Sequence, residues 1–307
     1  MSALTPDGTT VAFVGLGHMG GPMAANLAKA GYAVRGFDVV PEAVAKAEEA
    51  GVTGAASIAE AVAGADVVMT SLPNGALLLG CYRGEDGILA HAQPGALLVD
   101  TSTVDVDDAR AAADEARAAG LRALDAPVSG GVVGAEAGTL AFMVGGPEAD
   151  VEAARPVLDV LGARAVRCGD SGAGQAVKLC NNMLLAIHQI GVAEAFALAE
   201  KLGVEDQALY DVSSVATGQC WALNVNCPVP GPVPTSPANR EYQPGFAVSL
   251  MNKDLGLALA AVEKTGVHAE LGRHAGEVYR ALNEGETAGK DFSVVYRAIA
   301  ERSGIER

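Results

Sequence analysis

The segment GAGQAVKLCNNMLLA, residues 172–186, predicts a helix in which one amine and two amides lie among apolar residues. At 3.6 residues per turn, Lys178 and Asn182 lie one above the other on that helix. Gly174 precedes Lys178 by one turn and leaves room beside it for a ligand. A largely buried amine loses hydration, and its pKa then falls towards neutrality. We therefore expect Lys178 to act as a general base, with Asn182 holding a substrate oxygen or orienting the amine. A lysine on a solvated helix face is the alternative.

Two further segments could bind a substrate. Ser129, Gly130 and Gly131 follow a predicted strand, and backbone N–H groups beside a hydroxyl form a small cradle suited to a carboxylate. The same residue types also form ordinary turns. Lys253 and Asp254 lie in a second apolar helix, within LMNKDLGLA, where they are either functional groups or a simple exposed ion pair.

The segment VAFVGLGHMGG predicts a dinucleotide-binding turn. Gly15, Gly17 and Gly20 stand between a predicted strand and a predicted helix. In such a turn the first glycine permits a tight bend, the second lets the backbone approach a pyrophosphate, and the third lets helix and strand pack closely. The helix N-terminus supplies free N–H groups and a partial positive charge for the phosphates.

Asp38 distinguishes between two cofactors. It lies at the end of the second predicted strand, where a carboxylate accepts hydrogen bonds from ribose hydroxyls and repels a 2′-phosphate. We therefore expect NAD rather than NADP as the cofactor. Asp38 could instead cap the helix that begins near Pro41.

The loops after the third and fourth predicted strands, in SLPNGALL and DTSTVDVDD, are also expected to face the cofactor. Ligands of parallel sheets bind beyond the carboxyl ends of the strands. Thr103, in the second of these loops, could bind the cofactor, cap the next helix, or do both.

The order of the elements indicates two domains. Apolar strands alternate with alanine-rich helices in the first half, which is typical of a parallel sheet covered on both faces. The fold class is therefore an α/β Rossmann-type dinucleotide-binding domain, residues 1–170, followed by an all-α domain, residues 171–307, with a long helix joining the two. The predicted strands are residues 11–15, 33–38, 66–72, 96–102, 122–127 and 141–146, and the later helices are residues 173–201, 206–216, 246–265, 268–283 and 292–303.

A proline-rich segment, NCPVPGPVPTSPANREY at residues 226–242, interrupts the predicted helices. Proline removes a backbone donor and fixes one dihedral angle, so the segment cannot be regular helix or strand. It is either a flexible linker or a stiff loop over a site.

Composition excludes several classes of protein. The chain has 307 residues, half of them apolar, and a formal net charge of −16. This length allows a substantial core, and the negative charge disfavours nucleic acid and anionic membrane surfaces as partners. We expect no segment long and apolar enough to cross a bilayer, and no signal or transit peptide in the first ten residues. Five cysteines without CxxC spacing indicate free thiols in a cytoplasmic protein, and no metal site is predicted.

Taken together, these motifs resemble those of the β-hydroxyacid dehydrogenase family, over nearly the whole chain. GLGHMGGPMAANLAKAG is similar to the family's cofactor motif, and DAPVSGGVVGAEAGTLAFMVGG is similar to its substrate signature. GAGQAVKLCNNMLLA resembles the catalytic-helix motif, and LMNKDLGLA resembles the segment with a late lysine. The proline-rich segment is similar to one found in the hydroxyisobutyrate branch of the family.

The resemblance implies an NAD-dependent oxidoreductase that acts on a small 3-hydroxy acid, with (S)-3-hydroxyisobutyrate as the expected substrate, in valine degradation. A homodimer or homotetramer is also implied. Lys178 would be the acid/base and Asn182 would lie beside the substrate. The implied substrate-binding residues are Ser129, Gly130, Gly131, Lys253 and Asp254. The implied cofactor contacts are Gly15, Leu16, Gly17, His18, Met19, Gly20, Asp38, Leu72, Pro73, Leu77, Thr103 and Lys253, although residues 74–87 follow the family only loosely.

Other functions are disfavoured by particular features. A semialdehyde reductase of the tartronate, succinic or glyoxylate type is disfavoured by Asp38 and the proline-rich segment, since such enzymes often use NADPH. An imine reductase usually lacks the catalytic lysine, and 6-phosphogluconate dehydrogenase is longer. A non-catalytic NAD-binding sensor needs neither Lys178 nor Asn182.

Overall fold

The computed structural model describes residues 4–305 of the chain. We expected no signal or transit peptide in the first ten residues, and residues 1–3 of that segment lie outside the described range. The chain forms two compact units, Met1–Lys178 and Leu179–Arg307. The boundary between them lies inside helix α9 (Ala173–Lys201), whereas the predicted domains, 1–170 and 171–307, divide the chain just before that helix.

The first unit contains a nine-stranded sheet in the order β3-β2-β1-β4-β5-β6-β8-β7, with β9 paired to β8. Strands β1 to β6 are parallel, in the strand order of a dinucleotide-binding fold. The strands are β1 (Thr10–Val14), β2 (Ala33–Phe37), β3 (Thr53–Gly54), β4 (Val67–Thr70), β5 (Leu97–Asp100), β6 (Arg122–Asp125), β7 (Val128–Ser129), β8 (Leu140–Gly145) and β9 (Gly162–Gly169).

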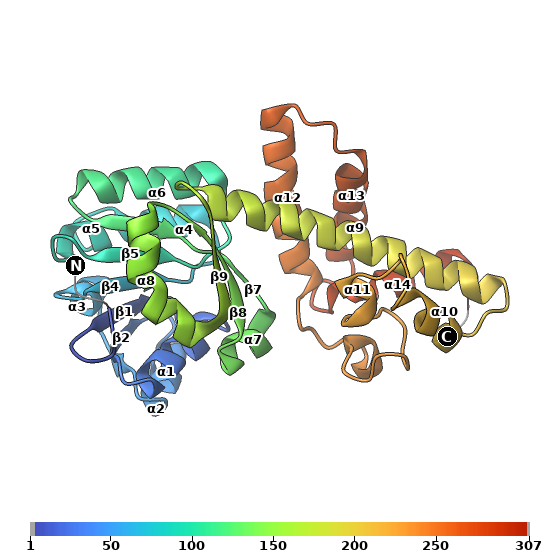
Figure 1. Ribbon diagram of the computed structural model, residues 1–307, viewed down its shortest axis with the longest axis horizontal. Coiled ribbons are helices and arrows are strands. Elements are labelled where there is room, and N and C mark those ends of the chain that lie inside the picture. The colour runs from blue at the N-terminus through green and yellow to red at the C-terminus, as the bar shows by residue number, and fades with distance from the viewer. Residues whose placement is uncertain (1–3, 306–307) are drawn as a thin grey trace. The chain divides into compact units, whose positions relative to one another are not determined.

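Helices cover both faces of this sheet (Figure 1). Side chains alternate along each strand, so Val11 and Phe13 of β1 pack into one core while Ala12 and Val14 pack into the other. The first core is completed by α1 (Gly20–Lys29), α2 (Pro41–Glu49), α7 (Gly131–Ala137) and α8 (Glu148–Leu161). The second is completed by α3 (Ile58–Val62), α4 (Gly75–Tyr82), α5 (Ile88–His91) and α6 (Val106–Ala118). The predicted α/β fold class is therefore confirmed.

The expectation of a purely parallel sheet is wrong at one edge. Strand β8 runs antiparallel to both β6 and β7. The chain reverses between β7 and β8 through α7, which ends at Gly138 in the left-handed conformation, with a φ of 65°. An apolar strand carries no mark of its direction, so the segment 141–146 gave no signal of this reversal. In this unit, strands β3, β7 and β9 and helices α4, α5, α7 and α8 were also not predicted.

The parallel strands bring their carboxyl ends to one edge of the sheet. Gly15 follows β1, Asp38 follows β2, and Ser71 follows β4. Backbone bonds join these ends: Gly15 N donates to Phe37 O at 2.9 Å, and Ser71 N donates to Val14 O at 3.0 Å. This edge positions the predicted cofactor residues.

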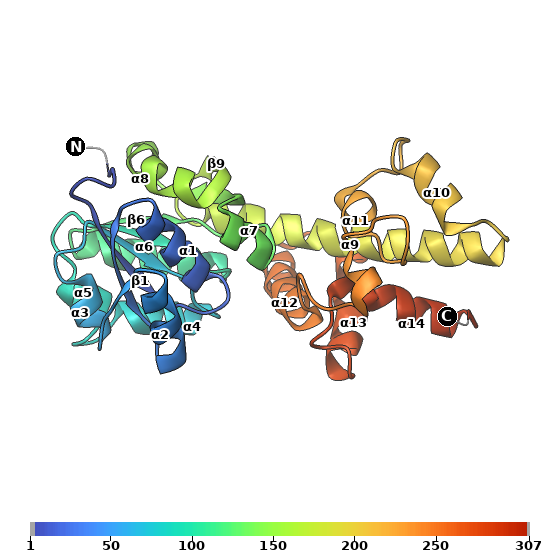
Figure 2. The same cartoon turned by 90° about the horizontal axis from the view of Figure 1, so that it is seen from below.

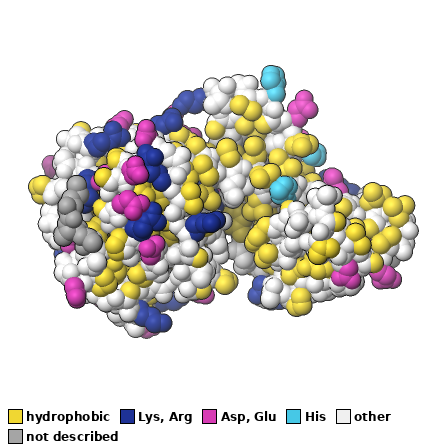
Figure 3. Space-filling model, in the orientation of Figure 1, with side chains coloured by type: hydrophobic (Ala, Val, Ile, Leu, Met, Phe, Trp, Pro, Cys, Tyr) yellow, Lys and Arg dark blue, Asp and Glu magenta, His cyan; other side chains and the backbone are white. Residues whose placement is uncertain are grey.

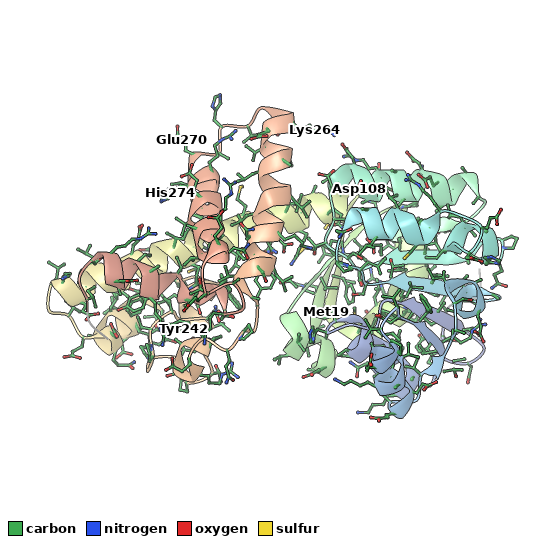
Figure 4. All side chains as sticks on the ribbon, turned by 180° about the vertical axis from the view of Figure 1, so that it is seen from behind. Met19, Asp108, Tyr242, Lys264, Glu270 and His274 are labelled. Carbon is green, nitrogen blue, oxygen red and sulfur yellow. The ribbon has the colours of Figure 1, made fainter. Side chains whose placement is uncertain are left out.

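The second unit is helical and has its own core, built around Ala186, Phe196, Met251, Tyr279 and Val295. Figure 2 shows α12, α13 and α14 on one side of α9, and α10 and α11 on the other. Beyond α9, the helices are α10 (Asp206–Ser213), α11 (Trp221–Asn224), η1 (Pro237–Arg240), α12 (Val248–Thr265), α13 (Glu270–Glu284), η2 (Phe292–Val294) and α14 (Val295–Arg302). The predicted helix 292–303 thus begins as a 3-10 turn. Lys264 and Glu270 lie at the tip of the α12–α13 hairpin (Figure 4).

The proline-rich segment is a folded loop of the helical unit. Tyr242 Oη donates to Pro228 O at 2.7 Å, and Asn239 Oδ1 accepts from Gly231 N at 2.9 Å. Asn226, at its start, donates to the buried Asp291 carboxylate at 3.1 Å. The interpretation of this segment as a flexible linker is therefore wrong, because its polar groups and its apolar side chains are used within one core.

Helix α9 corrects another expectation. It is long and apolar enough to cross a membrane, with a mean hydropathy of 1.3 over an 18-residue stretch, so the expectation that no segment reaches this length and hydropathy is wrong. However, 44% of that stretch is buried within the protein. The helix also buries Gln175, Lys178, Asn182 and Gln189. Polar side chains held in this way are typical of a core helix in a folded protein.

Candidate functional site

The glycine turn after β1 has the geometry of a phosphate site. Gly15 has a φ of 92°, and a Cβ there would collide with Ser71 O. A Cβ on Gly20 would collide with Gly15 O, so this glycine allows the helix to start close to the strand. At Gly17, by contrast, no described atom lies within 4 Å of the Cβ position. The fold itself does not require a glycine there, which fits a backbone approached by a ligand.

The first turn of α1 has few free backbone donors, because Pro22 has no N–H and Gly21 N donates to Gly17 O at 3.0 Å. Its N-cap, Met19, is labelled in Figure 4, and the Met19 side chain makes no capping hydrogen bond. The turn contains no acidic residue. Leu16 is buried beneath the turn, while His18 is exposed. The fit to the pyrophosphate of a dinucleotide therefore rests on the glycine turn before α1 and on the positive end of the helix dipole, rather than on several N–H groups of α1 itself.

Both oxygens of Asp38 accept backbone hydrogen bonds. Oδ2 accepts from Leu16 N at 2.7 Å, and Oδ1 accepts from Val40 N at 2.8 Å. The carboxylate therefore ties the glycine turn to the end of β2. The N-cap of α2 is Val40 rather than Asp38, so the capping alternative for Asp38 is wrong. Each carboxylate oxygen keeps a second lone pair that can accept a ribose hydroxyl.

The loops after β4 and β5 are joined through Ser102. Leu72 N donates to Ser102 Oγ at 2.8 Å, and Ser102 Oγ donates to Asp100 Oδ1 at 2.6 Å. Thr103, the next residue in the chain, is half-buried. The N-cap of α6 is Asp105, which accepts from Asp107 N at 2.8 Å. The interpretation of Thr103 as that cap is therefore wrong. Pro73 is exposed and Leu77 is 47% exposed, so both could contact a ligand.

Two buried aspartates that the sequence analysis missed end β5 and β6. Asp100 Oδ1 accepts from Thr70 Oγ1 and from Ser102, whereas Asp100 Oδ2 has no hydrogen-bond partner among the described residues. Burial raises the pKa of Asp100 to about 6, and the hydrogen bonds from Ser102 and Thr70 oppose the rise. Burial also raises the pKa of Asp125. Both carboxyls line a cavity of about 10 Å³. The one sequence feature that could have indicated these aspartates is an acidic residue at the end of a strand, in LLVD and RALD.

The start of α9 is fixed by Asp125. Its Oδ1 accepts from Gly172 N at 2.7 Å, and its Oδ2 accepts from Gln175 N at 3.0 Å. A Cβ on Gly174 would collide with Met143 O, so the helix approaches the sheet closely here. The expectation that Gly174 leaves room for a ligand is therefore wrong, because the sheet backbone fills this space. Lys178 follows on the same helix and is only 6% exposed. The alternative of a solvated lysine is therefore wrong.

The predicted carboxylate cradle lies between β7 and α7. Gly130 and Gly131 have φ values of 137° and 62°, which side-chain-bearing residues rarely adopt. Ser129 and Gly131 are half-buried and Gly130 is exposed. The backbone and the hydroxyl are therefore accessible to a small anion.

In the helical unit, a chain of polar groups runs from Asn182 to Lys253. Asn182 Oδ1 accepts from Asn181 Nδ2 at 3.0 Å, and Asn182 Nδ2 donates to Asp254 Oδ2 at 2.6 Å. Lys253 Nζ lies 3.4 Å from Asp254 Oδ1. Asp254 is buried, so the exposed-pair alternative is wrong for this carboxylate. It holds the Asn182 amide in one orientation and compensates the Lys253 charge.

The described part of the chain contains no cluster of side chains suited to bind a metal ion. Over residues 4–305, no group of three or more His, Cys, Asp or Glu side chains is placed to hold an ion. The five cysteines are free thiols.

Comparison with known proteins identifies both units. Residues 10–169 match the family model of the NAD binding domain of 6-phosphogluconate dehydrogenase. Residues 172–299 match the model described as NAD-binding of NADP-dependent 3-hydroxyisobutyrate dehydrogenase.

Three relatives extend over nearly the whole chain. A probable 3-hydroxyisobutyrate dehydrogenase of Mycobacterium tuberculosis is 54% identical, over 96% of this chain and 99% of its own. An NAD-dependent L-serine dehydrogenase of Pseudomonas aeruginosa is 46% identical, over 96% of this chain and 99% of its own. The solved structure of a Mycobacterium tuberculosis 3-hydroxyisobutyrate dehydrogenase with L-serine is 55% identical, over 95% and 99%, with a TM-score of 0.91.

Asp100→Asn tests the burial of that carboxyl through the pH dependence of stability. Its pKa is about 6 in the folded protein and 3.8 ordinarily. Between these values the native state holds a proton that the unfolded chain has lost, so wild-type stability falls as the pH rises through them. We expect the stability of the variant relative to wild type to increase by about 1 kcal/mol from pH 5 to pH 7.5.

Urea unfolding of the whole protein at pH 5 and pH 7.5 measures the stability of the variant relative to wild type. Asp86→Asn, at an exposed carboxyl, is the control and should show no such change. A relative stability of Asp100→Asn that is the same at both pH values would contradict the raised pKa.

Proposed function

The chain belongs to the 3-hydroxyisobutyrate dehydrogenase branch of the β-hydroxyacid dehydrogenase family, and we propose that it oxidises (S)-3-hydroxyisobutyrate to methylmalonate semialdehyde with NAD as acceptor. The reaction would be a step of valine degradation. One observation carries the proposal: the amine of Lys178 is buried on a helix whose first turn is held at the carboxyl end of β6. In this unit, the sheet edge that holds that turn also carries the dinucleotide-binding loops.

NAD would be held by the loops at that sheet edge. Its pyrophosphate would lie on the glycine turn and the first turn of α1, and its ribose would bind Asp38. We assign the remaining cofactor contacts to Leu72, Pro73, Leu77, Thr103 and Lys253. Bound NAD supplies the acceptor for the hydride that leaves the alcohol carbon.

Lys178 would move the proton. In oxidation its uncharged amine accepts the hydroxyl proton, and in reduction the ammonium form returns it. Its burial keeps the amine away from bulk water. Asn182, one helical turn on, would orient the substrate oxygen or the amine, and Asp254 fixes the direction of its amide.

The acid's carboxylate would bind at Ser129, Gly130 and Gly131, with the ammonium group of Lys253 as its positively charged partner. The accessible backbone and hydroxyl of the cradle support this assignment. L-serine is the second candidate substrate, because a relative at 46% identity is named for it and a similar structure contains it. L-serine differs from 3-hydroxyisobutyrate in carrying an ammonium group in place of a methyl group.

A panel of acids tests the proposed reaction. We expect the protein to reduce NAD, which is measured by the absorbance of NADH. The kcat/KM for (S)-3-hydroxyisobutyrate should be higher than that for L-serine. Lys178→Ala should lower kcat by about 10³-fold with unchanged NAD affinity, because it removes only the proton acceptor. Lys201→Ala, an exposed lysine at the other end of α9, is the matched control.

Near-normal turnover in Lys178→Ala would refute the acid/base assignment. Absence of NAD reduction with every 3-hydroxy acid would favour the sensor instead. Preferential reduction of tartronate, succinic or glyoxylate semialdehyde with NADPH would favour the reductase alternative.

Asp38→Asn tests the preference for NAD over NADP. The variant loses the charge that repels a 2′-phosphate, and we expect the ratio of kcat/KM values to shift towards NADP by about tenfold. It also loses one backbone hydrogen bond, because the new NH₂ group would face Leu16 N or Val40 N. Glu42→Gln, an exposed acid in the first turn of α2, should keep the wild-type ratio. An unaltered ratio in Asp38→Asn would count against this assignment.

We also propose a homodimer or homotetramer formed through the helical unit. Leu184, Gly191 and Leu198 recur every seven residues along α9, and the two leucines are 51% and 61% exposed. Figure 3 shows hydrophobic side chains exposed along this helix. Such a stripe is typical of helix pairing. Sedimentation velocity at micromolar concentration should give an oligomer, and a monomer would oppose the proposal.

The proposed compartment is the cytoplasm. Its support is the free thiols and the acidic composition, which also disfavours nucleic acid and membrane surfaces as partners. Recovery of the protein in a membrane fraction would oppose this assignment.

A further inference from the structure

The side chain of Gln175 binds the two peptide groups on either side of Thr103. Its Nε2 donates to Ser102 O at 2.7 Å, and its Oε1 accepts from Val104 N at 3.1 Å. Gln175 is fully buried, with 0% of its surface exposed. One amide therefore satisfies both buried backbone groups that flank Thr103, and it leaves the peptide units of this loop a single orientation.

The main chain of Gln175 is fixed as firmly as its side chain. Its N–H donates to Asp125 Oδ2 at 3.0 Å, beside the bond from Gly172 N to Asp125 Oδ1. Gln175 thus bridges two strand ends, with its backbone at the end of β6 and its side chain at the loop after β5. Lys178 follows it on the same helix, within one turn.

The bridge continues to the loop after β4. Ser102, whose carbonyl binds Gln175, accepts from Leu72 N at 2.8 Å through its hydroxyl. The same hydroxyl donates to Asp100 at 2.6 Å. The first turn of α9 and the two loops assigned to the cofactor therefore form one hydrogen-bond network within the α/β unit.

We propose that Gln175 is a positioning residue, which sets the loop containing Thr103 relative to the amine of Lys178. This inference rests on the proposed function, in which the loop contacts NAD and the amine accepts the proton. Hydride and proton leave the same alcohol, so the cofactor loop and the Lys178 amine must be correctly placed relative to one another. A displacement of about 1 Å between them lowers the rate on the order of 100-fold. Gln175 touches neither reactant and acts through the two peptide groups it binds.

A merely structural role for Gln175 is the competing account, and Gln189 provides the matched control. Gln189 is also on α9 and also has 0% of its surface exposed. Its amide lies 3.4 Å from Asn226 O and 3.5 Å from Asn226 Nδ2, in the helical unit. Replacement of either glutamine removes a buried amide from the same helix, but only Gln175 binds a cofactor loop.

Gln175→Met and Gln189→Met test the proposal, since methionine keeps the length of the side chain and removes its hydrogen bonds. In Gln175→Met we expect the Kd of NADH, measured by fluorescence titration, to rise about tenfold and kcat to fall about 100-fold. The KM of the acid should stay within about threefold, because its cradle is untouched. Without cofactor, amide hydrogen exchange should become faster at Ser102–Val104. Gln189→Met should match wild type in all four measurements within about twofold, whatever its melting temperature.

Equal NADH affinity, kcat and exchange in the two methionine variants would overturn the proposal. If Gln175→Met does not fold, Gln175→Asn replaces it. That amide is one carbon shorter and can keep only one of the two bonds, so at least a threefold loss of NADH affinity is expected and an unchanged affinity would overturn the proposal. Failure of wild type to oxidise any 3-hydroxy acid would refute the proposed function, while NADH affinity and amide exchange would still decide the role of Gln175.

Discussion

The pair of hydrogen bonds from Gly172 N and Gln175 N to the buried carboxylate of Asp125 is the contact on which the rest of the site depends. It holds the first turn of α9 against the carboxyl end of β6, at the same sheet edge as the loops that we assign to the cofactor. Together with the side chain of Gln175, this contact fixes the start of the long helix and therefore the position of Lys178 relative to the sheet. A charged acceptor suits this place, because the N-terminus of a helix carries unsatisfied donors and a partial positive charge.

The same edge of the sheet concentrates buried polar groups that a purely structural sheet would avoid. Asp100 keeps one oxygen without a hydrogen-bond partner among the described residues, and burial raises its pKa to about 6. Its other oxygen organises Thr70 and Ser102, and through Ser102 the backbone of Leu72. A destabilising carboxyl is thus retained where it fixes the two loops that we assign to the cofactor, and functional sites are where such destabilising groups usually occur. The helical unit repeats the arrangement, with buried Asp254 directing Asn182.

Local sequence was sufficient for some parts of this molecule and insufficient for others. The glycine turn, the acid after β2 and the apolar helix that carries Lys178 and Asn182 each lie within one short segment, so spacing alone predicted them. The antiparallel β8, the bond between Asn182 and Asp254, and the bridge from Gln175 to Ser102 join residues far apart in the sequence. Such pairs depend on topology, which periodicity does not reveal. Asp125 illustrates the limit: it looked like the end of a strand, and only the fold shows that it anchors a helix.

We propose that the Lys178 amine exchanges a proton with the substrate's alcohol. A crystal structure of the protein with NAD and (S)-3-hydroxyisobutyrate would show whether the two groups meet. We expect Lys178 Nζ to lie within hydrogen-bond distance of the hydroxyl oxygen, about 2.6–3.2 Å, with the carboxylate on Ser129–Gly131. An amine that instead points into solvent, with another titratable group on the hydroxyl, would contradict it.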